Sequence, residues 1–292
     1  MSHGVFSGII TKCIGGLYTV ESPDGIYECK ARGIFRNRGI SPCAGDRVAI
    51  NNGVITEVAE RKNCIIRPPL ANLDQLVFVV STCSPSPNFL LLDKFIAIAE
   101  YKGITPIIVV TKADLGDSRD ICEIYGRIGI DVYIADYSDS ASIEAVKKLL
   151  YGKISAFTGN SGVGKSTLLN AVDPTLNIPT AGISEKLGRG RHTTRHAELY
   201  RLDEGGYIAD TPGFSTFDTN RYEIIRKEEL ADCFREFGEF TESCRFKDCS
   251  HTCENGCAVL EALDRGMISA SRHASYRSMY DEAKLLKEWE LK

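Results

Sequence analysis

The sequence predicts a multidomain fold: a small β-barrel, then an α/β domain, then a mainly helical C-terminal region. Three observations support this order. Short alternating segments fill residues 1–69, and patterns typical of buried strands and helices alternate over residues 70–218. Cysteines and a histidine crowd into one polar loop within residues 219–292. Hydrophobic residues make up 43% of the 292 residues, which is enough to build several packed cores.

The first domain contains five segments with the alternation of half-buried strands. They are Val5–Ile10, Leu17–Glu21, Ile26–Ala31, Arg47–Ile50 and Val54–Val58. Asn51-Asn52-Gly53 separates the last two and is a strong hairpin signal. So many short strands in so few residues suit a small closed barrel. We expect an OB-fold, with an SH3-like barrel as the structural alternative.

Basic side chains are enriched in this first domain. Residues 1–69 carry nine Lys/Arg against six Asp/Glu, whereas the whole chain has a net charge of −4, so contact with a polyanion is favoured. After the third strand, cations surround one aromatic side chain on a predicted loop, a pattern typical of RNA-binding surfaces. The candidate RNA-binding residues are Lys30, Arg32, Phe35, Arg36 and Arg38.

Beyond Arg67-Pro68-Pro69, which we interpret as a linker, the pattern changes. The continuous apolar runs Gln75–Ser81 and Pro106–Thr111 are typical of buried parallel strands. Further elements are expected as helices at Phe89–Tyr101, Ser118–Arg127 and Ser142–Tyr151, and as a strand at Val132–Ala135. Such alternation predicts a doubly wound α/β domain.

A complete G-x-x-x-x-G-K-S phosphate loop lies between the apolar segment Ile154–Phe157 and a helical pattern. Its glycines let backbone N–H groups turn inward, and the helix N-terminus adds partial positive charge. Lys165 is expected to reach the outer phosphates and Ser166 to hold Mg²⁺. The predicted phosphate-binding residues are Gly159, Asn160, Ser161, Gly162, Val163, Gly164, Lys165, Ser166 and Thr167.

A base-recognition motif, Thr111-Lys112-Ala113-Asp114, stands where the second buried strand ends. Asp114 can accept two hydrogen bonds from the N1–H and the N2 amino group of guanine, and Lys112 can lie along the base plane. Adenine offers no such pair of donors, so the carboxylate would reject it. We therefore expect Thr111, Lys112, Ala113 and Asp114 to bind GTP.

A third motif, D-T-P-G, runs from Asp210 to Gly213. Asp210 would hold Mg²⁺ through water, and the Gly213 N–H group would contact the γ-phosphate. Residues 187–196 are polar and glycine-bearing without periodicity, as a nucleotide-dependent switch would be. Either Thr193 or Thr194 would give Mg²⁺ its second hydroxyl, and spacing does not choose between them.

The order of these motifs is unusual. In ordinary GTPases the phosphate loop comes first and the base-recognition motif comes near the end. Here residues 111–114 precede residues 159–166, which precede residues 210–213. The cyclic order is kept, so we interpret the domain as circularly permuted. The chain leaving the third motif continues directly into the C-terminal region, so the nucleotide state could reposition that region.

Four of the eleven cysteines crowd into residues 244–257. Thiolates and an imidazole in one short loop are what tetrahedral Zn²⁺ binds, with a disulfide or redox role as the alternative. Five side chains compete for four places: Cys244, Cys249, His251, Cys253 and Cys257. The flanking residues 227–237 and 258–292 look helical, so the metal would stabilise a small helical domain.

The barrel, the motif order and the C-x₄-C-x-H-x₅-C spacing together resemble the RsgA/YjeQ/YloQ family of bacterial small-ribosomal-subunit biogenesis GTPases, over nearly the whole chain. The resemblance implies one structural Zn²⁺ at Cys244, Cys249, His251 and Cys257, with Cys253 left over. It also implies binding to the small (30S) subunit and its rRNA late in maturation, subunit-stimulated hydrolysis of GTP to GDP, and release afterwards.

The resemblance bears on mechanism too. Phe214 follows D-T-P-G where many GTPases keep a water-orienting glutamine, and an apolar side chain cannot position water. His192 matches the family's proposed catalytic histidine, while Thr111 replaces the more usual asparagine. We expect a cytoplasmic protein with no membrane partner, because no apolar run reaches membrane-spanning length and no signal peptide is recognisable. We also expect a monomer. The alternatives are a GTP-gated RNA-binding switch and, less consistent with Asp114, a metabolic kinase.

Overall fold

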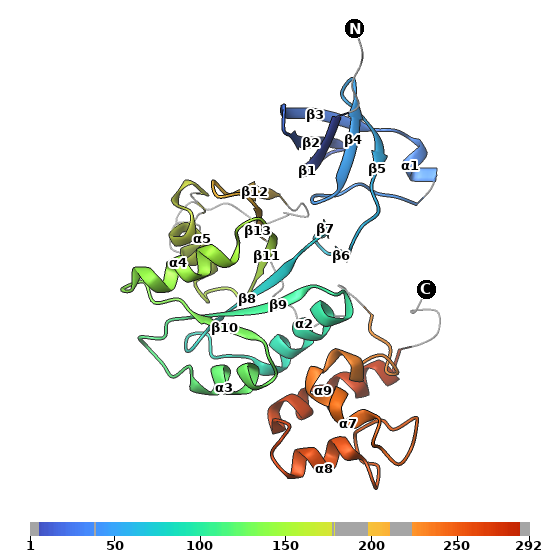
Figure 1. The fold of residues 1–292 in the computed structure, drawn as a ribbon, viewed down its shortest axis with the longest axis vertical. Coiled ribbons are helices and arrows are strands. Elements are labelled where there is room, and N and C mark those ends of the chain that lie inside the picture. The colour runs from blue at the N-terminus through green and yellow to red at the C-terminus, as the bar shows by residue number, and fades with distance from the viewer. Residues whose placement is uncertain (1–5, 38, 177, 179–197, 211–223, 287–292) are drawn as a thin grey trace.

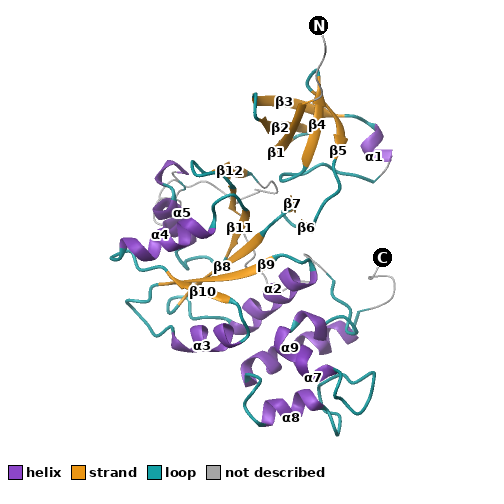
Figure 2. Cartoon of the chain, in the orientation of Figure 1, coloured by secondary structure: helices purple, strands orange, loops and turns teal. Residues whose placement is uncertain are grey.

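The computed structural model describes residues 6–37, 39–176, 178, 198–210 and 224–286. Figure 1 shows a barrel, a central sheet with helices on both faces, and a helical C-terminal part packed against the central domain. Figure 2 shows that strands are confined to the first two parts. Within the described residues, no helix combines the length and the apolar character needed to cross a membrane.

Five strands close the barrel in the order β1-β2-β3-β5-β4. They are β1 (Phe6–Ile14), β2 (Leu17–Ser22), β3 (Gly25–Ala31), β4 (Arg47–Asn51) and β5 (Val54–Val58). Only β3 and β5 pair in parallel, which is the arrangement of an OB-fold. The alternation predicted from the sequence places Ile10, Val20 and Ile55 in a fully buried core. The predicted barrel is therefore confirmed.

The segment after β3, predicted as a basic loop, has a different structure from the one expected. It contains the short helix α1 (Ile34–Asn37), and the ring of Phe35 is buried in the barrel core. The prediction that the Phe35 ring stands among the RNA-binding side chains of a loop is therefore wrong, because burying a phenyl ring in the core stabilises the barrel more than exposing it. Lys30 and Arg32 are exposed. Arg36 lies in α1, and Arg38 lies outside the described residues.

The predicted linker at Arg67-Pro68-Pro69 is instead part of a small hairpin, in which Arg67 and Pro68 form the turn and Pro69 begins the second strand. Its strands are β6 (Cys64–Ile66) and β7 (Pro69–Ala71), which pair antiparallel. The Asn63 side chain holds the hairpin base by donating to the Leu73 carbonyl (2.8 Å) and accepting from the Leu73 N–H group (2.9 Å). An ordered, packed segment therefore joins the barrel to the central domain.

The central sheet has six strands in the order β10-β9-β8-β11-β13-β12. They are β8 (Gln75–Ser81), β9 (Thr105–Thr111), β10 (Asp131–Ile134), β11 (Ile154–Thr158), β12 (Leu199–Arg201) and β13 (Tyr207–Asp210). All neighbours are parallel except β12, which is antiparallel to β13. The carboxyl ends of β8, β9, β11 and β13 therefore lie at one edge, which is where ligands bind in such sheets.

Helices cover both faces of this sheet (Figure 2). One face carries α2 (Phe89–Tyr101) and α3 (Arg119–Arg127), and the other carries α4 (Ser140–Leu149) and α5 (Lys165–Val172), followed by the 3₁₀ helix η1 (Pro174–Leu176). The Asn88 side chain caps α2 by accepting from the Leu91 N–H group (2.9 Å). The predicted doubly wound α/β domain is confirmed.

The C-terminal part is helical, as predicted, but its helices are shorter. They are the 3₁₀ helices η3 (Ala231–Cys233) and η4 (Arg235–Phe237), and the α-helices α7 (Gly238–Thr241), α8 (Ala258–Asp264) and α9 (Ala270–Lys284). Gly266, with φ +71°, lies in the turn between α8 and α9. Glycine suits this position because other residues rarely adopt the left-handed conformation. Tyr276 packs edge to ring against both Phe234 and Phe237, which stack on each other in the core.

Candidate functional site: the nucleotide-binding edge and a Cys₃His cluster

The phosphate loop runs from the end of β11 to the start of α5 (Figure 1). Gly162 (φ +83°) and Gly164 (φ +94°) both adopt the left-handed conformation. A Cβ atom on Gly159 would lie 2.5 Å from the Val79 carbonyl oxygen on β8. The glycines of the motif are therefore required by the backbone path, which leaves N–H groups available to an anion at the helix N-terminus.

The base-recognition motif contacts this loop directly. The Thr111 hydroxyl, at the end of β9, donates to the Val163 carbonyl of the phosphate loop. The Lys112 Nζ atom donates to the Gly162 carbonyl (2.8 Å) and to the Ser84 carbonyl. Asp114 is exposed in the turn that follows. Thr111, at the position where asparagine is more usual, thus links the base-recognition motif to the phosphate loop by a hydrogen bond. Asp114 is accessible to a base.

The third motif approaches from the other side of the phosphate loop. Asp210 is the last residue of β13 and pairs with Phe157 of β11, so it stands beside the start of the loop. Ser166, in the first turn of α5, is half-buried at the same edge. The remaining predicted residues of this site, Gly213, His192, Thr193 and Thr194, lie outside the described residues.

The segment between β8 and α2 also belongs to this site, although its residues were not among those predicted from the sequence. The Ser81 hydroxyl donates to the Pro85 carbonyl (2.7 Å), and the Thr82 hydroxyl donates to the Lys112 carbonyl. With the phosphate loop and the start of α2, this segment encloses a small, mainly apolar pocket of about 40 Å³. The signal was present: Ser84-Pro85-Ser86-Pro87 follows a buried strand directly, at the edge where ligands bind.

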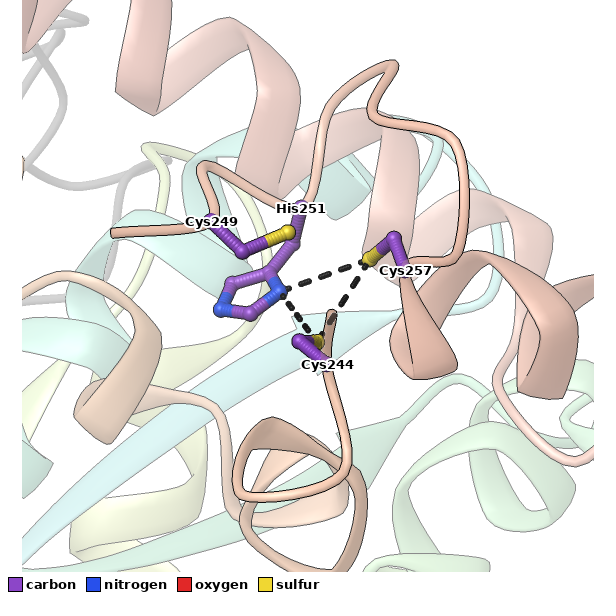
Figure 3. Close-up of side chains that lie close together, drawn as sticks. All are labelled: Cys244, Cys249, His251 and Cys257. Carbon is purple, nitrogen blue, oxygen red and sulfur yellow. Dashed lines mark hydrogen bonds between the residues drawn. The ribbon is translucent and has the colours of Figure 1, made fainter. Parts of the chain in front are cut away.

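A second candidate site lies in the C-terminal part. The ligand atoms of Cys244, Cys249, His251 and Cys257 all lie within 4.8 Å of one another (Figure 3). The Cys244 and Cys257 sulfurs are 3.9 Å apart, and each is 3.5–3.6 Å from the His251 Nδ1 atom. Cys253, the fifth candidate, is exposed and outside this group.

These separations fit a tetrahedral metal ion. Bonds of about 2.3 Å to sulfur and about 2.0 Å to nitrogen place two sulfurs about 3.8 Å apart and a sulfur about 3.5 Å from a nitrogen. Burial lowers the pKa of His251, which favours the neutral imidazole that a metal needs. The backbone that presents the ligands is held by His273, whose Nε2 atom lies 2.8 Å from the His251 carbonyl, and by Tyr276, which donates to the Ser250 carbonyl (2.9 Å).

A buried charge network joins this part to the nucleotide-binding domain. Arg272 of α9 donates to Asp93 of α2 (2.8 Å) and, through two nitrogens, to Glu236 of η4 (2.7 and 3.1 Å). Tyr125 of α3 also donates to Asp93 (2.8 Å), and the Arg272 guanidinium stacks 4.5 Å from the Phe234 ring centroid. Because α2 begins beside the phosphate loop, the network connects the C-terminal part to the nucleotide site through buried polar contacts.

Comparisons with known proteins agree with this architecture. Residues 58–220 match the family described as RsgA GTPase, and residues 7–57 match the RsgA N-terminal domain. The chain is 42% identical over 285 residues to the small ribosomal subunit biogenesis GTPase RsgA of Caldanaerobacter subterraneus subsp. tengcongensis, with 95% of each chain covered. It is also 42% identical over 280 residues to the protein of that name from Streptococcus pneumoniae, with 94% of each covered.

Two solved structures share the complete fold. The crystal structure of YjeQ from Thermotoga maritima aligns with a TM-score of 0.82 at 36% identity, covering 97% of this chain and 99% of that one. YloQ, described as a circularly permuted GTPase, aligns with a TM-score of 0.78 at 36% identity, covering 97% and 96%. The predicted circular permutation and the predicted resemblance are confirmed. The chain belongs to the RsgA GTPase family.

Proposed function

We propose that this chain is a GTPase that assists late maturation of the small (30S) ribosomal subunit and hydrolyses GTP to GDP and phosphate when stimulated by that subunit. The observation that carries the proposal is the contact of Thr111 and Lys112 with the phosphate loop, which unites base recognition and phosphate binding in one site. The assignment to the small subunit rests on the relatives, which are named for its biogenesis.

Each motif has a distinct part in this proposal. Residues 159–167 bind the phosphates, and Asp114 reads guanine while Lys112 supports the base plane. Ser166 and Asp210, with Thr193 or Thr194, would hold Mg²⁺, which neutralises charge on the phosphates. The Gly213 N–H group would sense the γ-phosphate.

His192 is our candidate to orient the attacking water. Phe214 occupies the position where many GTPases carry glutamine, and its side chain offers no donor or acceptor. His192→Ala should lower hydrolysis while leaving GTP affinity within about twofold, since the residue is proposed to act only in the transition state. Loss of GTP binding in that variant would contradict this role.

Zinc is the metal that we propose for the Cys₃His cluster. Three thiolates and one imidazole form a closed structural site without an open position for water. It would stabilise the helices around it, since α7 and α8 are each shorter than three turns and bury little area alone. Metal analysis should give one zinc per chain.

Lys30 and Arg32, with Arg36 and Arg38 nearby in sequence, are the residues that we propose to contact ribosomal RNA. Charge reversal at Arg32 should weaken binding and reduce its salt dependence. We further propose that the protein acts in the cytoplasm as a monomer.

The function is tested by co-sedimentation with purified small subunits in the presence of GTP, GDP or a non-hydrolysable GTP analogue. We expect strong binding with GTP or the analogue and weak binding with GDP. Equal binding in all states would contradict the proposal. Nucleotide-dependent binding to another RNA, without binding to small subunits, would instead indicate a GTP-gated RNA switch.

A further inference from the structure

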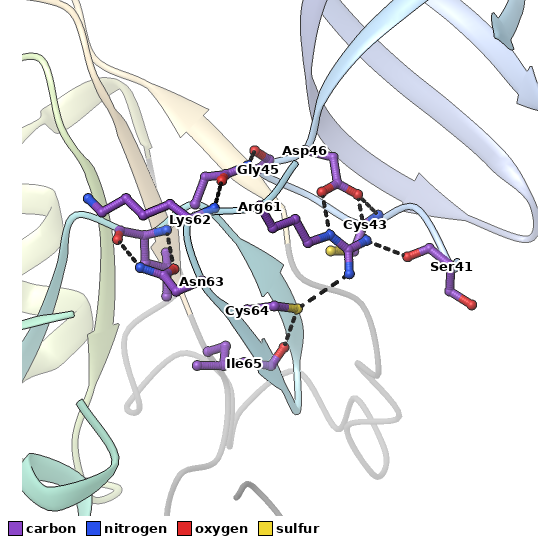
Figure 4. Close-up of polar contacts among 11 residues, drawn as sticks. Ser41, Cys43, Gly45, Asp46, Arg61, Lys62, Asn63, Cys64 and Ile65 are labelled. Carbon is purple, nitrogen blue, oxygen red and sulfur yellow. Dashed lines mark hydrogen bonds and ion pairs between the residues drawn. The ribbon is translucent and has the colours of Figure 1, made fainter. Parts of the chain in front are cut away.

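A second polar cluster lies where the barrel meets the β6–β7 hairpin, away from both sites described above (Figure 4). The Arg61 guanidinium makes a two-pronged ion pair with Asp46 (2.7 and 2.8 Å) and also donates to the Ser41 carbonyl (2.7 Å). Asp46 is completely buried and accepts a further bond from the Cys43 N–H group (2.8 Å). Arg61 therefore ties residues 41–46 of the barrel to the chain that enters the hairpin.

Two cysteines flank this ion pair. The third arm of Arg61 points at Cys64, with Nη1 3.7 Å from the sulfur. The Cys43 and Cys64 side chains both lie beside the Arg61 guanidinium (Figure 4). Cys43 is buried, whereas Cys64 is partly exposed. The neighbouring Cys43 thiol and the Arg61 cation lower the pKa of Cys64 to about 7, whereas the Cys64 side chain and burial raise the pKa of Cys43.

This arrangement is that of a reactive cysteine beside a second cysteine, which could react with the oxidised form of the first. A thiolate is the nucleophilic form of cysteine, and a nearby cation stabilises it; a second cysteine close by can capture its oxidised product. Among the residues that the structure describes, no other cysteine shows this combination. Cys29, for example, is buried in the barrel core, and burial raises its pKa.

We propose that Cys43 and Cys64 form a reversible oxidation site in which hydrogen peroxide is the oxidant and a disulfide is the product. The Cys64 thiolate attacks one peroxide oxygen, and the O–O bond breaks to release hydroxide, which leaves as water after taking a proton. The Cys43 sulfur then attacks the resulting Cys64 sulfenic acid, loses its own proton and expels a second water. Two thiols lose two electrons, and the peroxide gains them.

The disulfide would fix an existing contact between domains. Residues 44 and 45 already lie against the hairpin: the Ala71 N–H group donates to the Ala44 carbonyl (2.9 Å), and a Cβ atom on Gly45 would lie 2.0 Å from the Ala71 carbonyl oxygen. A disulfide requires the two sulfurs to approach to about 2.0 Å. Oxidation should therefore covalently lock the barrel to the strand that leads into the GTPase domain.

Peptide mapping of the full-length, metal-loaded protein tests this proposal. After treatment with a few equivalents of hydrogen peroxide, free thiols are blocked and the digest is searched for a Cys43–Cys64 cross-linked peptide. We expect this peptide to be the main oxidised product and to disappear with dithiothreitol. Oxidation that falls mainly on other cysteines, with no such peptide, would overturn the proposal.

Kinetics on the unmodified protein provide a second, variant-free test. Alkylation of Cys64 by iodoacetamide should rise with pH around a midpoint near 7, whereas Cys122, a partly exposed thiol on α3, serves as the matched comparison. At pH 7 Cys64 should react roughly threefold faster than an ordinary exposed cysteine, since the larger thiolate fraction of Cys64 outweighs its lower intrinsic nucleophilicity. Equal rates and equal midpoints would overturn the assignment of Cys64 as the attacking thiol.

Two variants separate the roles of the pair. With Cys43→Ser, Cys64 should stop at the sulfenic acid, which dimedone traps. With Cys64→Ser, the buried Cys43 should remain reduced. Oxidation of Cys43 at an undiminished rate in Cys64→Ser would contradict the proposed order of the two steps.

Discussion

Replacing Arg272 with methionine should lower the folding free energy that comes from the contact between the C-terminal part and the nucleotide-binding domain. Arg272 and Asp93 are 1% and 0% exposed in their side chains, and Glu236 is 6% exposed. Methionine keeps much of the apolar stem but leaves two carboxylates without their cation. Breaking a buried ion pair in this way costs about 3–5 kcal/mol of folding free energy, which is the loss that we expect near pH 8.

The loss should depend on pH in a defined direction. Burial raises the pKa of Asp93, and the Arg272 guanidinium opposes that rise. Without Arg272, the folded-state pKa moves further above the value of about 3.9 in the unfolded chain. A group with a raised folded-state pKa stabilises the fold at low pH and loses that stabilisation as pH rises through the folded-state value. The Arg272→Met variant should therefore be destabilised less at pH 5.5 than at pH 8.

Urea unfolding followed by far-UV circular dichroism measures both effects. Arg277→Met, at an exposed position on the same helix, is the matched control and should change the unfolding free energy by less than about 0.5 kcal/mol. Adding Asp93→Asn to Arg272→Met should restore part of the stability and reduce the pH dependence. If Arg272→Met matched Arg277→Met, or if its loss were independent of pH and of Asp93, the reasoning would be refuted.

Three further predictions follow from the two sites. Gly159→Ala places a Cβ 2.5 Å from a backbone carbonyl of β8 and should weaken binding of a fluorescent GTP analogue at least about tenfold, whereas Gly126→Ala, which meets nothing within 4 Å, should not. Asp114→Asn should lower GTP affinity by roughly 100-fold or more while improving binding of xanthosine triphosphate, because the amide offers a donor to the xanthine C2 carbonyl. Calorimetry with both nucleotides tests this prediction, and unchanged GTP affinity would contradict it. Cys257→Ser should lose the metal, and with it the thermal stability of the C-terminal part, whereas Cys253→Ser should keep both. Metal analysis and thermal unfolding scans distinguish the two variants, and equal metal content in both would exclude the proposed ligand set.

Local signals made much of the fold predictable. The barrel strands follow from alternation and from turns such as Asn51-Asn52-Gly53, where Asn52 and Gly53 both have positive φ. The phosphate loop follows from glycine spacing, because its backbone path excludes side chains. The helix Phe89–Tyr101 was predicted with the bounds that the structure shows. In each case the information lies within a few consecutive residues.

The remaining features depend on contacts between distant residues. Phe35 looked like an exposed ring among cations, and only closure of the barrel shows that it is buried. The prolines at 68 and 69 looked like a linker, although Asn63 and Leu73 close a hairpin around them. The choice among five possible metal ligands likewise came from a resemblance, and the turn that excludes Cys253 is visible only in three dimensions.

The central claim is tested most directly by measuring GTP hydrolysis with purified small ribosomal subunits, with large subunits as the control. We predict slow hydrolysis by the protein alone, strong stimulation by small subunits, and little change with large subunits. His192→Ala should bind GTP and small subunits but lose most of the stimulated rate. If small subunits did not accelerate hydrolysis although GTP bound tightly, the proposed function would be contradicted.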